Sequence, residues 1–255
     1  MSWTLAVTGK GGVGKTTLAA MAVRWLAAHG RGPVLAVDAD PNTSLDALLG
    51  VRAARSVGGV REEAKRIAQA ESAGGMGKAE LLDLKIQEAL VESDAFDLIA
   101  MGRPEGPGCY CYANNVLRHV LARLSGRYPS VVIDNEAGLE SLSRRTTQAV
   151  DWLLFVAEPS ARGLATARRL YDLAVEMQVA AGAMGVAVNR MRDGDGSLDR
   201  ARDRFEGTPV RVLGGCPEDP GLAARDATGE PVWTLPDDSP AWHAAAALME
   251  RMAGP

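Results

Sequence analysis

Glycines, a lysine and two threonines near the N-terminus are spaced for binding phosphate. The segment Leu5–Thr17 reads LAVTGKGGVGKTT, and its residues after Thr8 are Gly9, Lys10, Gly11, Gly12, Val13, Gly14, Lys15, Thr16 and Thr17. Closely spaced glycines let successive backbone N–H groups turn toward one phosphate. In such a loop Lys15 contacts the β- and γ-phosphates, the Thr16 hydroxyl holds Mg²⁺, and Thr17 reaches a further phosphate oxygen. The pattern predicts a P-loop that binds ATP or ADP with Mg²⁺.

The flanking segments place this loop between a strand and a helix. An apolar run, Leu5–Val7, precedes it, and an alanine- and leucine-rich segment continues to His29. This context is the one that a P-loop requires, because the helix N-terminus adds its own attraction for phosphate. The alternative is a glycine-rich turn between strand and helix that binds no ligand.

A second lysine, Lys10, refines the interpretation of the loop. The run Lys10-Gly-Gly-Val-Gly-Lys-Thr-Thr resembles the deviant P-loop of the group of ATPases that contains MinD, ParA and the nitrogenase iron protein. The resemblance implies that Lys10 reaches the nucleotide of a partner subunit, so that ATP is held between two copies in a homodimer. Alternatively, Lys10 is a solvated lysine on a loop.

Two aspartates follow the next predicted strand, Val34–Val37. Side chains at the carboxyl ends of parallel strands lie beside the ligand site of an open α/β sheet. We therefore assign Asp40 to orienting the attacking water, and Asp38 to the second coordination shell of Mg²⁺. The alternative is that both carboxylates are turn and cap residues before a short helix, Leu45–Leu49.

A second acidic segment begins at the end of the predicted strand Ser130–Asp134. It reads Asp-Asn-Glu-Ala-Gly and ends at Gly138. Asp134 at the strand end is expected near Mg²⁺, and Gly138 where the backbone senses the γ-phosphate. A switch helix is predicted over residues 139–148. Its two arginines, Arg144 and Arg145, either relay the nucleotide state or are solvated surface residues.

The base of the nucleotide is expected to lie between two later segments. Asn189 ends the predicted strand Gly185–Asn189 and is placed to read the edge of adenine, although it could instead cap a turn. Pro217, in the run Cys216–Asp219 after a predicted strand over residues 210–213, is placed in the opposite wall. Cys216 itself is interpreted as a small packing residue rather than a metal ligand.

Two of the three cysteines of the chain, Cys109 and Cys111, lie in a glycine- and proline-rich loop. In an extended segment, residues two apart point the same way, so both sulfurs can bind one metal ion. A tetrahedral site usually needs four ligands, and a second copy of the loop across a two-fold axis would supply the other two. Thiolates favour Ni²⁺, Zn²⁺, Cu⁺ or an Fe–S cluster. The alternatives are a redox pair of thiols or a chance pair.

The composition bounds the remaining possibilities. A chain of 255 residues, 47% hydrophobic, fits one domain, 1–255, and its formal net charge of −4 offers no general attraction to nucleic acid or an anionic membrane. No apolar run approaches the roughly 20 residues that span a bilayer, and the first strand leaves no room for a signal peptide. We expect a cytoplasmic protein. The segment 240–252 is predicted to be a packing helix rather than a membrane anchor.

The alternation of buried strands with helices predicts an α/β fold of the P-loop NTPase type. Its central sheet should be mostly parallel, with helices on both faces. Seven strands are predicted, and those not yet given cover residues 96–101 and 152–157. A long helix is expected from Ala161 to about Val179, and another over residues 116–125.

Together, the P-loop with Lys10, the run Asp38–Asn42, the Cys109-x-Cys111 loop and the Asp134–Gly138 segment resemble the CooC/AcsF family. The resemblance implies an ATPase that dimerises with ATP, carries a metal on both cysteine pairs, and delivers nickel to a client such as carbon monoxide dehydrogenase or acetyl-CoA synthase. One departure is Ser141, where a histidine often follows the switch glutamate in that family. Two alternatives are an ATP-dependent reductase with a bridging Fe–S cluster, and a positioning ATPase like ParA or MinD.

Overall fold

The computed structural model describes residues 2–59, 78–102, 121–138 and 149–254. Their strands are β1 (Trp3–Gly9), β2 (Val34–Asp38), β3 (Leu90–Glu92), β4 (Phe96–Ala100), β5 (Ser130–Asp134), β6 (Val150–Ala157), β7 (Ala181–Met191) and β8 (Arg211–Pro217). Their α-helices are α1 (Lys15–Ala28), α2 (Leu45–Leu49), α4 (Lys78–Ala89), α6 (Ala161–Glu176), α7 (Ser197–Phe205), α8 (Pro220–Thr228) and α9 (Pro240–Ala253).

The strands form one eight-stranded sheet in the order β3-β4-β2-β5-β1-β6-β7-β8. Seven strands run parallel, and only β3 pairs antiparallel, with β4. The chain leaves the central strand β1 toward β2 on one side and reaches β6 on the other. A sheet of this kind binds ligands at the carboxyl ends of its strands, where the order reverses.

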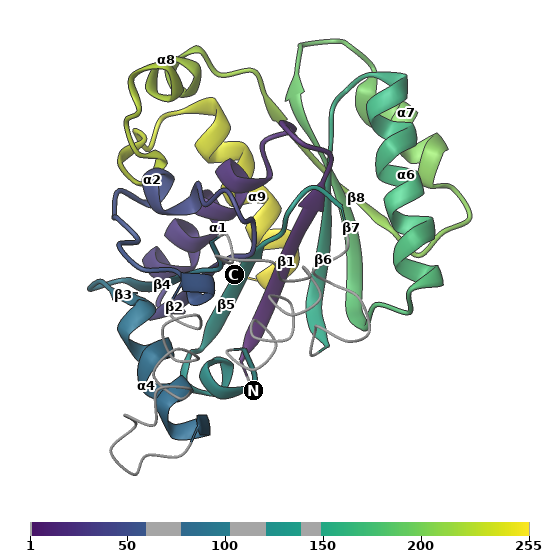
Figure 1. Ribbon diagram of the computed structural model, residues 1–255. Helices are drawn as coiled ribbons and strands as arrows, with labels where there is room; N and C mark the ends of the chain where they lie inside the picture. The colour runs from purple at the N-terminus through teal and green to yellow at the C-terminus, as the bar shows by residue number, and fades with distance from the viewer. Residues whose placement is uncertain (1, 60–77, 103–120, 139–148, 255) are drawn as a thin grey trace.

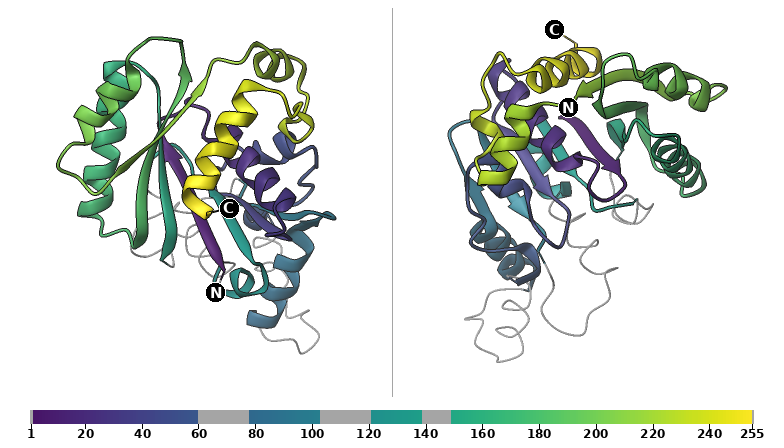
Figure 2. Two further views of the ribbon diagram at one scale, coloured as in Figure 1. Left: turned by 180° about the vertical axis from the view of Figure 1, so that it is seen from behind. Right: turned by 90° about the horizontal axis from the view of Figure 1, so that it is seen from above.

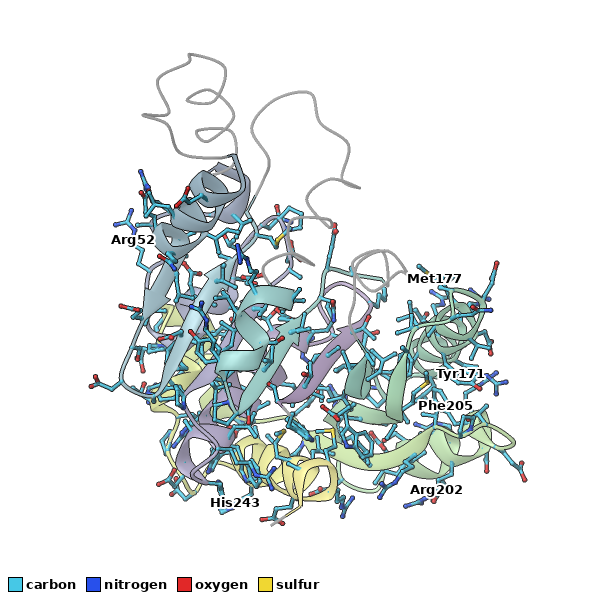
Figure 3. The ribbon with its side chains drawn as sticks, turned by 90° about the horizontal axis from the view of Figure 1, so that it is seen from below. Arg52, Tyr171, Met177, Arg202, Phe205 and His243 are labelled. Carbon is cyan, nitrogen blue, oxygen red and sulfur yellow. The ribbon has the colours of Figure 1, made fainter. Side chains whose placement is uncertain are left out.

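Two apolar layers cover the sheet, as the alternation of its strands requires. Leu5 and Val7 of β1 belong to the cluster that packs against α1 and α9, whereas Ala6 belongs to the cluster on the other face, with residues of α6 and α7. Figure 1 shows α1, α2, α8 and α9 on one side of the sheet and α6 and α7 on the other. In Figure 3, Tyr171 of α6 and Phe205 of α7 accordingly lie apart from His243 of α9. The predicted α/β fold is confirmed.

Most predicted elements have the expected places, and α2 has the expected bounds. The edge strand β3 was not anticipated: its three residues follow α4 directly, and only their pairing with β4 makes them a strand. The helices α7 and α8 were not assigned either. The predicted helix over 139–148, residues 116–120 of the predicted helix over 116–125, and the cysteine loop lie outside the described residues.

Helix α9 is a packing helix, as predicted. It crosses the face of the sheet seen in Figure 2, and its buried side chains include Leu248, Met249 and Met252. Arg24 of α1 contacts the beginning of α9 and the segment before it. Its guanidinium donates to Leu235 O at 2.6 Å and lies 4.1 Å from the centre of the Trp242 ring. No helix in the described part of the chain is both long and apolar enough to cross a bilayer.

Candidate functional site

The predicted site residues gather at one edge of the sheet, because β1, β2 and β5 are parallel neighbours. Val7 of β1 and Asp38 of β2 are both paired in register with Asp134 of β5. The loop after β1 leads directly into α1, above the strand ends in Figure 1. Three segments that are far apart in the sequence therefore end around one point.

The start of α1 is open to an anion. Gly12 and Gly14 have φ values of 78° and 92°, in the left-handed region that glycine adopts without a steric penalty. Gly14 is the N-cap, no side chain caps the helix, and its first turn contains no acidic residue. In contrast, Ser160, Asp219 and Ser239 cap α6, α8 and α9 with their own side chains. The free N–H groups and the helix dipole of α1 are therefore available for phosphate.

The loop is packed so tightly that two of its glycines cannot carry a side chain. A Cβ at Gly9 would lie 2.6 Å from Val156 O, and a Cβ at Gly14 would lie 2.3 Å from Asn189 Nδ2. Asn189 Nδ2 donates to Val13 O at 2.7 Å. The side chain assigned to the base thus also fixes the phosphate loop, and its Oδ1 remains an acceptor.

The two lysines of the loop have different environments. Lys15 is only 7% exposed, and its Nζ donates to Lys10 O at 3.3 Å. This bond closes the loop around the ammonium group. Lys10 has an exposed side chain. Lys15 is therefore placed for a ligand inside the loop, and Lys10 for one outside it.

Asp134 has the environment of a cation ligand. It is 1% exposed, and burial raises its pKa to about 7, with a further increase from Asp38 that a hydrogen bond from Thr16 and the charge of Lys15 oppose. Its Oδ1 is buried without a hydrogen-bond partner among the described residues. A buried carboxylate oxygen without a partner beside a threonine hydroxyl fits Mg²⁺, which prefers hard oxygen ligands. Thr16 and Asp134 would hold the ion, which would neutralise phosphate charge.

Asp38 performs the capping role that was its alternative interpretation. Its carboxylate is fully buried and accepts from Asp40 N at 3.0 Å, Ser44 N at 2.8 Å and Leu45 N at 3.0 Å. Burial raises the pKa of Asp38, against the effect of these bonds. Ser44, the N-cap of α2, makes no side-chain capping bond to that helix. Asp38 therefore shapes the loop that carries Asp40, and its role beside Mg²⁺ stays a prediction.

Asp40 and Gly138 lie on loops that are tied to the sheet. Asp40 is half-buried, and its Oδ1 accepts from Asn42 N at 2.8 Å. Gly138, with φ 120°, accepts a hydrogen bond from the buried Thr8 hydroxyl at 2.6 Å. Thr8 belongs to β1, directly before the phosphate loop. The segment assigned to sensing the γ-phosphate is thus bonded to the strand that leads into the phosphate loop.

Two adjoining cavities extend from the loop, of about 370 Å³ and 450 Å³. The first is lined by Lys15, Thr16 and Ser44, among others, and the second by Asn189, Pro217 and Val232, among others. The structure thus brings the two predicted base-pocket residues to one cavity beside the loop. Their contact with a base stays a prediction.

Four residues that line both cavities were missed by the sequence analysis. They are Leu48, Arg190, Asp226 and Glu230. Asp226 and Glu230 come from α8 and the turn after it, which no motif indicated. Arg190 follows Asn189 directly, and regular strand alternation would have placed it on the opposite face.

The cysteines divide into two groups. Cys109 and Cys111 lie outside the described residues, so their metal site stays a prediction. Cys216 is 2% exposed, and burial raises its pKa to about 12, as expected of a packing residue. Within the described ranges, no group of three or more His, Cys, Asp and Glu side chains could hold a metal ion.

A comparison with protein families shows to which family the chain belongs. The model of CbiA, described as the CobQ/CobB/MinD/ParA nucleotide binding domain, matches residues 4–232. The chain belongs to this family. The description of this family as a nucleotide binding domain agrees with the open start of α1, the buried Lys15 and the two cavities beside the loop.

Individual relatives span the whole domain. An uncharacterised ATP-binding protein of Methanocaldococcus jannaschii is 39% identical over 250 residues, 97% of each chain. The carbon monoxide dehydrogenase accessory protein CooC of Rhodospirillum rubrum is 34% identical over 270 aligned positions, also 97% of each. Among solved structures, the MinD cell division protein of Aquifex aeolicus superposes with a TM-score of 0.71 and 25% identity, covering 100% of this chain and 98% of that one.

Proposed function

We propose that this protein is an ATP-hydrolysing metallochaperone, which dimerises with ATP and inserts nickel into a client metalloenzyme. The observation that carries the ATPase part is the uncapped start of α1 beside buried Lys15 and Asp134. The nickel part is supported by the similarity to CooC over 97% of both chains and by the Cys109-x-Cys111 loop. A carbon monoxide dehydrogenase of the same host is the client that this similarity favours.

The chain's residues divide the work of hydrolysis. The N–H groups of the loop and Lys15 bind the phosphates, and Asp40 orients the water that attacks the terminal phosphorus. The bond from that phosphorus to the oxygen of ADP breaks, and ADP and phosphate are released. Lys10, exposed on the rim of the loop, reaches the nucleotide of the second subunit and adds positive charge there.

Metal delivery requires that the two nucleotide states bind metal with different free energies. ATP closes the dimer and brings both cysteine pairs onto one ion, and hydrolysis reopens it, so that the ion passes to the client. A loop without that difference would only store metal.

The experiment is an anaerobic titration of the protein with Ni²⁺ and with Zn²⁺. It is done without nucleotide, with ADP and with a non-hydrolysable ATP analogue, and the mass of the complex is followed alongside. The variant Cys109→Ala/Cys111→Ala is compared with Cys216→Ala, a matched control because the thiol of Cys216 is buried and protonated.

The expected result is one metal per dimer, retained by Cys216→Ala, lost by the double variant, and changed in affinity by nucleotide. A metal affinity that is the same with and without nucleotide would contradict the delivery of metal by ATP hydrolysis. Dimers driven by nucleotide, without cysteine-dependent metal, contradict the metallochaperone. Iron with the absorbance of a cluster would instead indicate the Fe–S reductase.

A positioning ATPase is the second candidate, favoured by the full-length similarity to MinD of Aquifex aeolicus. Such a protein needs no metal and acts at a membrane or on DNA. The net charge of −4 offers no general attraction to DNA or anionic lipid, and α9 packs against α1 rather than being free to anchor to a membrane. Co-sedimentation with anionic vesicles, and gel shift with duplex DNA, in the presence of ATP would distinguish it from the metallochaperone.

A further inference from the structure

Arg190 has an unusual backbone. Its φ is 58°, in the left-handed region that an arginine rarely adopts. The pairing of β7 with β8 shifts register at the same place, between Asn189 and Met191. Backbone strain of this kind persists only where the surrounding structure imposes it, and it gathers at functional sites.

The irregularity changes where the side chain points. Asn189 faces the phosphate loop, where it bonds to Val13 O, so its neighbour in a regular strand would face the other side of the sheet. A bulge can re-aim a side chain. Arg190 accordingly lines both cavities, on the same side as Asn189.

Two basic and four acidic side chains line the cavities among the described residues. Of the described residues that line them, only Lys15 and Arg190 carry a permanent positive charge, against the carboxylates of Glu218, Asp219, Asp226 and Glu230. Lys15 is buried within the loop, at the far end from the base wall. A nucleotide lying along this cleft would bring further negative charge past Asp226 and Glu230.

Neighbouring arginines are already engaged, whereas Arg190 is not. Arg192 pairs with Glu218 at 3.1 Å, and Arg225 pairs with Glu230 at 3.1 Å. No hydrogen bond or ion pair to another described residue holds the exposed guanidinium of Arg190. Its backbone is thus fixed in a strained position while its charged group is left for a ligand.

We propose that Arg190 binds the α-phosphate of the nucleotide, where the two cavities meet, while Lys15 holds the outer phosphates. Gly14 and Thr17 line the same junction. If the outer phosphates of a nucleotide lie in the loop and its base lies beside Pro217, its α-phosphate lies at this junction of the two cavities. This inference rests on the proposed function only in requiring that ATP binds at this site.

The test measures affinities by titration calorimetry for ATP, ADP and AMP, and by ligand-observed NMR for adenosine. Arg190→Gln removes the charge, Arg190→Lys keeps it, and Arg202→Gln is the control, because Arg202 is an exposed arginine on α7 that lines neither cavity. Arg190→Gln should weaken all three phosphorylated ligands about 10- to 100-fold, the loss of one charged hydrogen-bonding contact. It should leave adenosine binding unchanged. Arg190→Lys should restore part of the affinity, and Arg202→Gln should behave as the wild type.

A further variant separates binding from folding. Arg190→Gly removes the side chain and the strain together, so its thermal unfolding midpoint should equal or exceed that of the wild type while AMP affinity falls as in Arg190→Gln. Equal losses for adenosine and AMP, or unchanged affinities in both variants, would overturn the role of Arg190. If the wild type itself binds no ATP, the proposed ATPase fails instead.

Discussion

At the scale of single residues, Gly14 shows how one position serves both the loop and the base pocket. Its positive φ starts α1 without a capping side chain, and the absence of a Cβ leaves room for Asn189. Asn189 in turn bonds to Val13 of the same loop. A side chain at position 14 would therefore disturb both the phosphate loop and the position of Asn189.

Replacing Gly14 with alanine should weaken ATP binding by more than about tenfold. The left-handed φ should also cost about 1–3 kcal/mol of unfolding free energy. The physical reason for the loss of affinity is displacement of Asn189, whose Nδ2 would lie 2.3 Å from the new Cβ. Calorimetric titration with ATP and denaturant unfolding would measure the two effects.

Gly12→Ala is the matched control. Gly12 also has a positive φ, of 78°, but a Cβ there meets nothing within 4 Å. It should cost similar stability with a smaller loss of affinity. Equal losses of affinity in the two variants would show that backbone strain, not Asn189, is responsible.

At the scale of elements, one carboxylate joins α8, which lines the cavity of about 450 Å³, to α9. Asp219 Oδ1 accepts from Gly221 N and Leu222 N at the start of α8, and Oδ2 accepts from Ser239 Oγ and Ala241 N at the start of α9. Burial alone would raise the pKa of Asp219, but these bonds outweigh it and lower the pKa. The start of α8, beside that cavity, is therefore tied to the start of α9.

Asp219→Asn should reduce stability by about 1–2 kcal/mol at neutral pH, because an amide nitrogen cannot accept from Ser239 and Ala241. The carboxylate's pKa is lower in the folded protein than its ordinary value near 3.9. Its stabilisation is thus fully present above that value and is lost as pH falls through the lowered pKa. The difference in unfolding free energy between wild type and variant should therefore begin to shrink below about pH 4 and keep shrinking as pH falls through the lowered pKa.

Urea unfolding of both proteins from pH 7 to pH 3 would measure this convergence. Asp237→Asn is a suitable control, since Asp237 is a mostly exposed carboxylate paired with Arg24. A constant difference between wild type and Asp219→Asn across the whole range would contradict the linkage of Asp219 ionisation to folding.

At the scale of the whole molecule, the rim of the phosphate loop carries an exposed lysine. Lys10 has its side chain in solvent, while its carbonyl binds Lys15 within the loop. A residue whose backbone shapes the site and whose charge points away from it suits a contact with a second copy. The proposed homodimer depends on this contact.

Lys10→Ala should abolish dimerisation driven by a non-hydrolysable ATP analogue and lower ATP hydrolysis at least about tenfold. ADP affinity should change little, because the backbone bond to Lys15 remains. Analytical ultracentrifugation with and without the analogue would show the difference. Arg202→Ala, on α7 across the sheet, removes the same charge and should dimerise normally. If Lys10→Ala dimerises with the analogue to the same extent as the wild type, Lys10 does not hold the two subunits together.

Much of the fold and the centre of the site follow from local patterns. The glycines, Lys15 and Thr16 are adjacent in the chain, so their spacing alone predicts a phosphate cradle between strand and helix. The apolar runs of β2, β5 and β6 predict buried parallel strands, because a strand covered on both faces must be apolar throughout. Parallel pairing then places Asp38 and Asp134 side by side at their ends.

Only the tertiary structure decided the remaining contacts, because they join segments that share no local pattern. Asn189 and Val13 are 176 positions apart, and the packing of β7 beside the loop brings them together. The strand β3 exists through its pairing with β4, and Asp38 caps α2 through a turn of the chain back onto the sheet. Arg190 lines both cavities beside the loop because a register shift interrupts strand alternation, and sequence periodicity contains no sign of that shift.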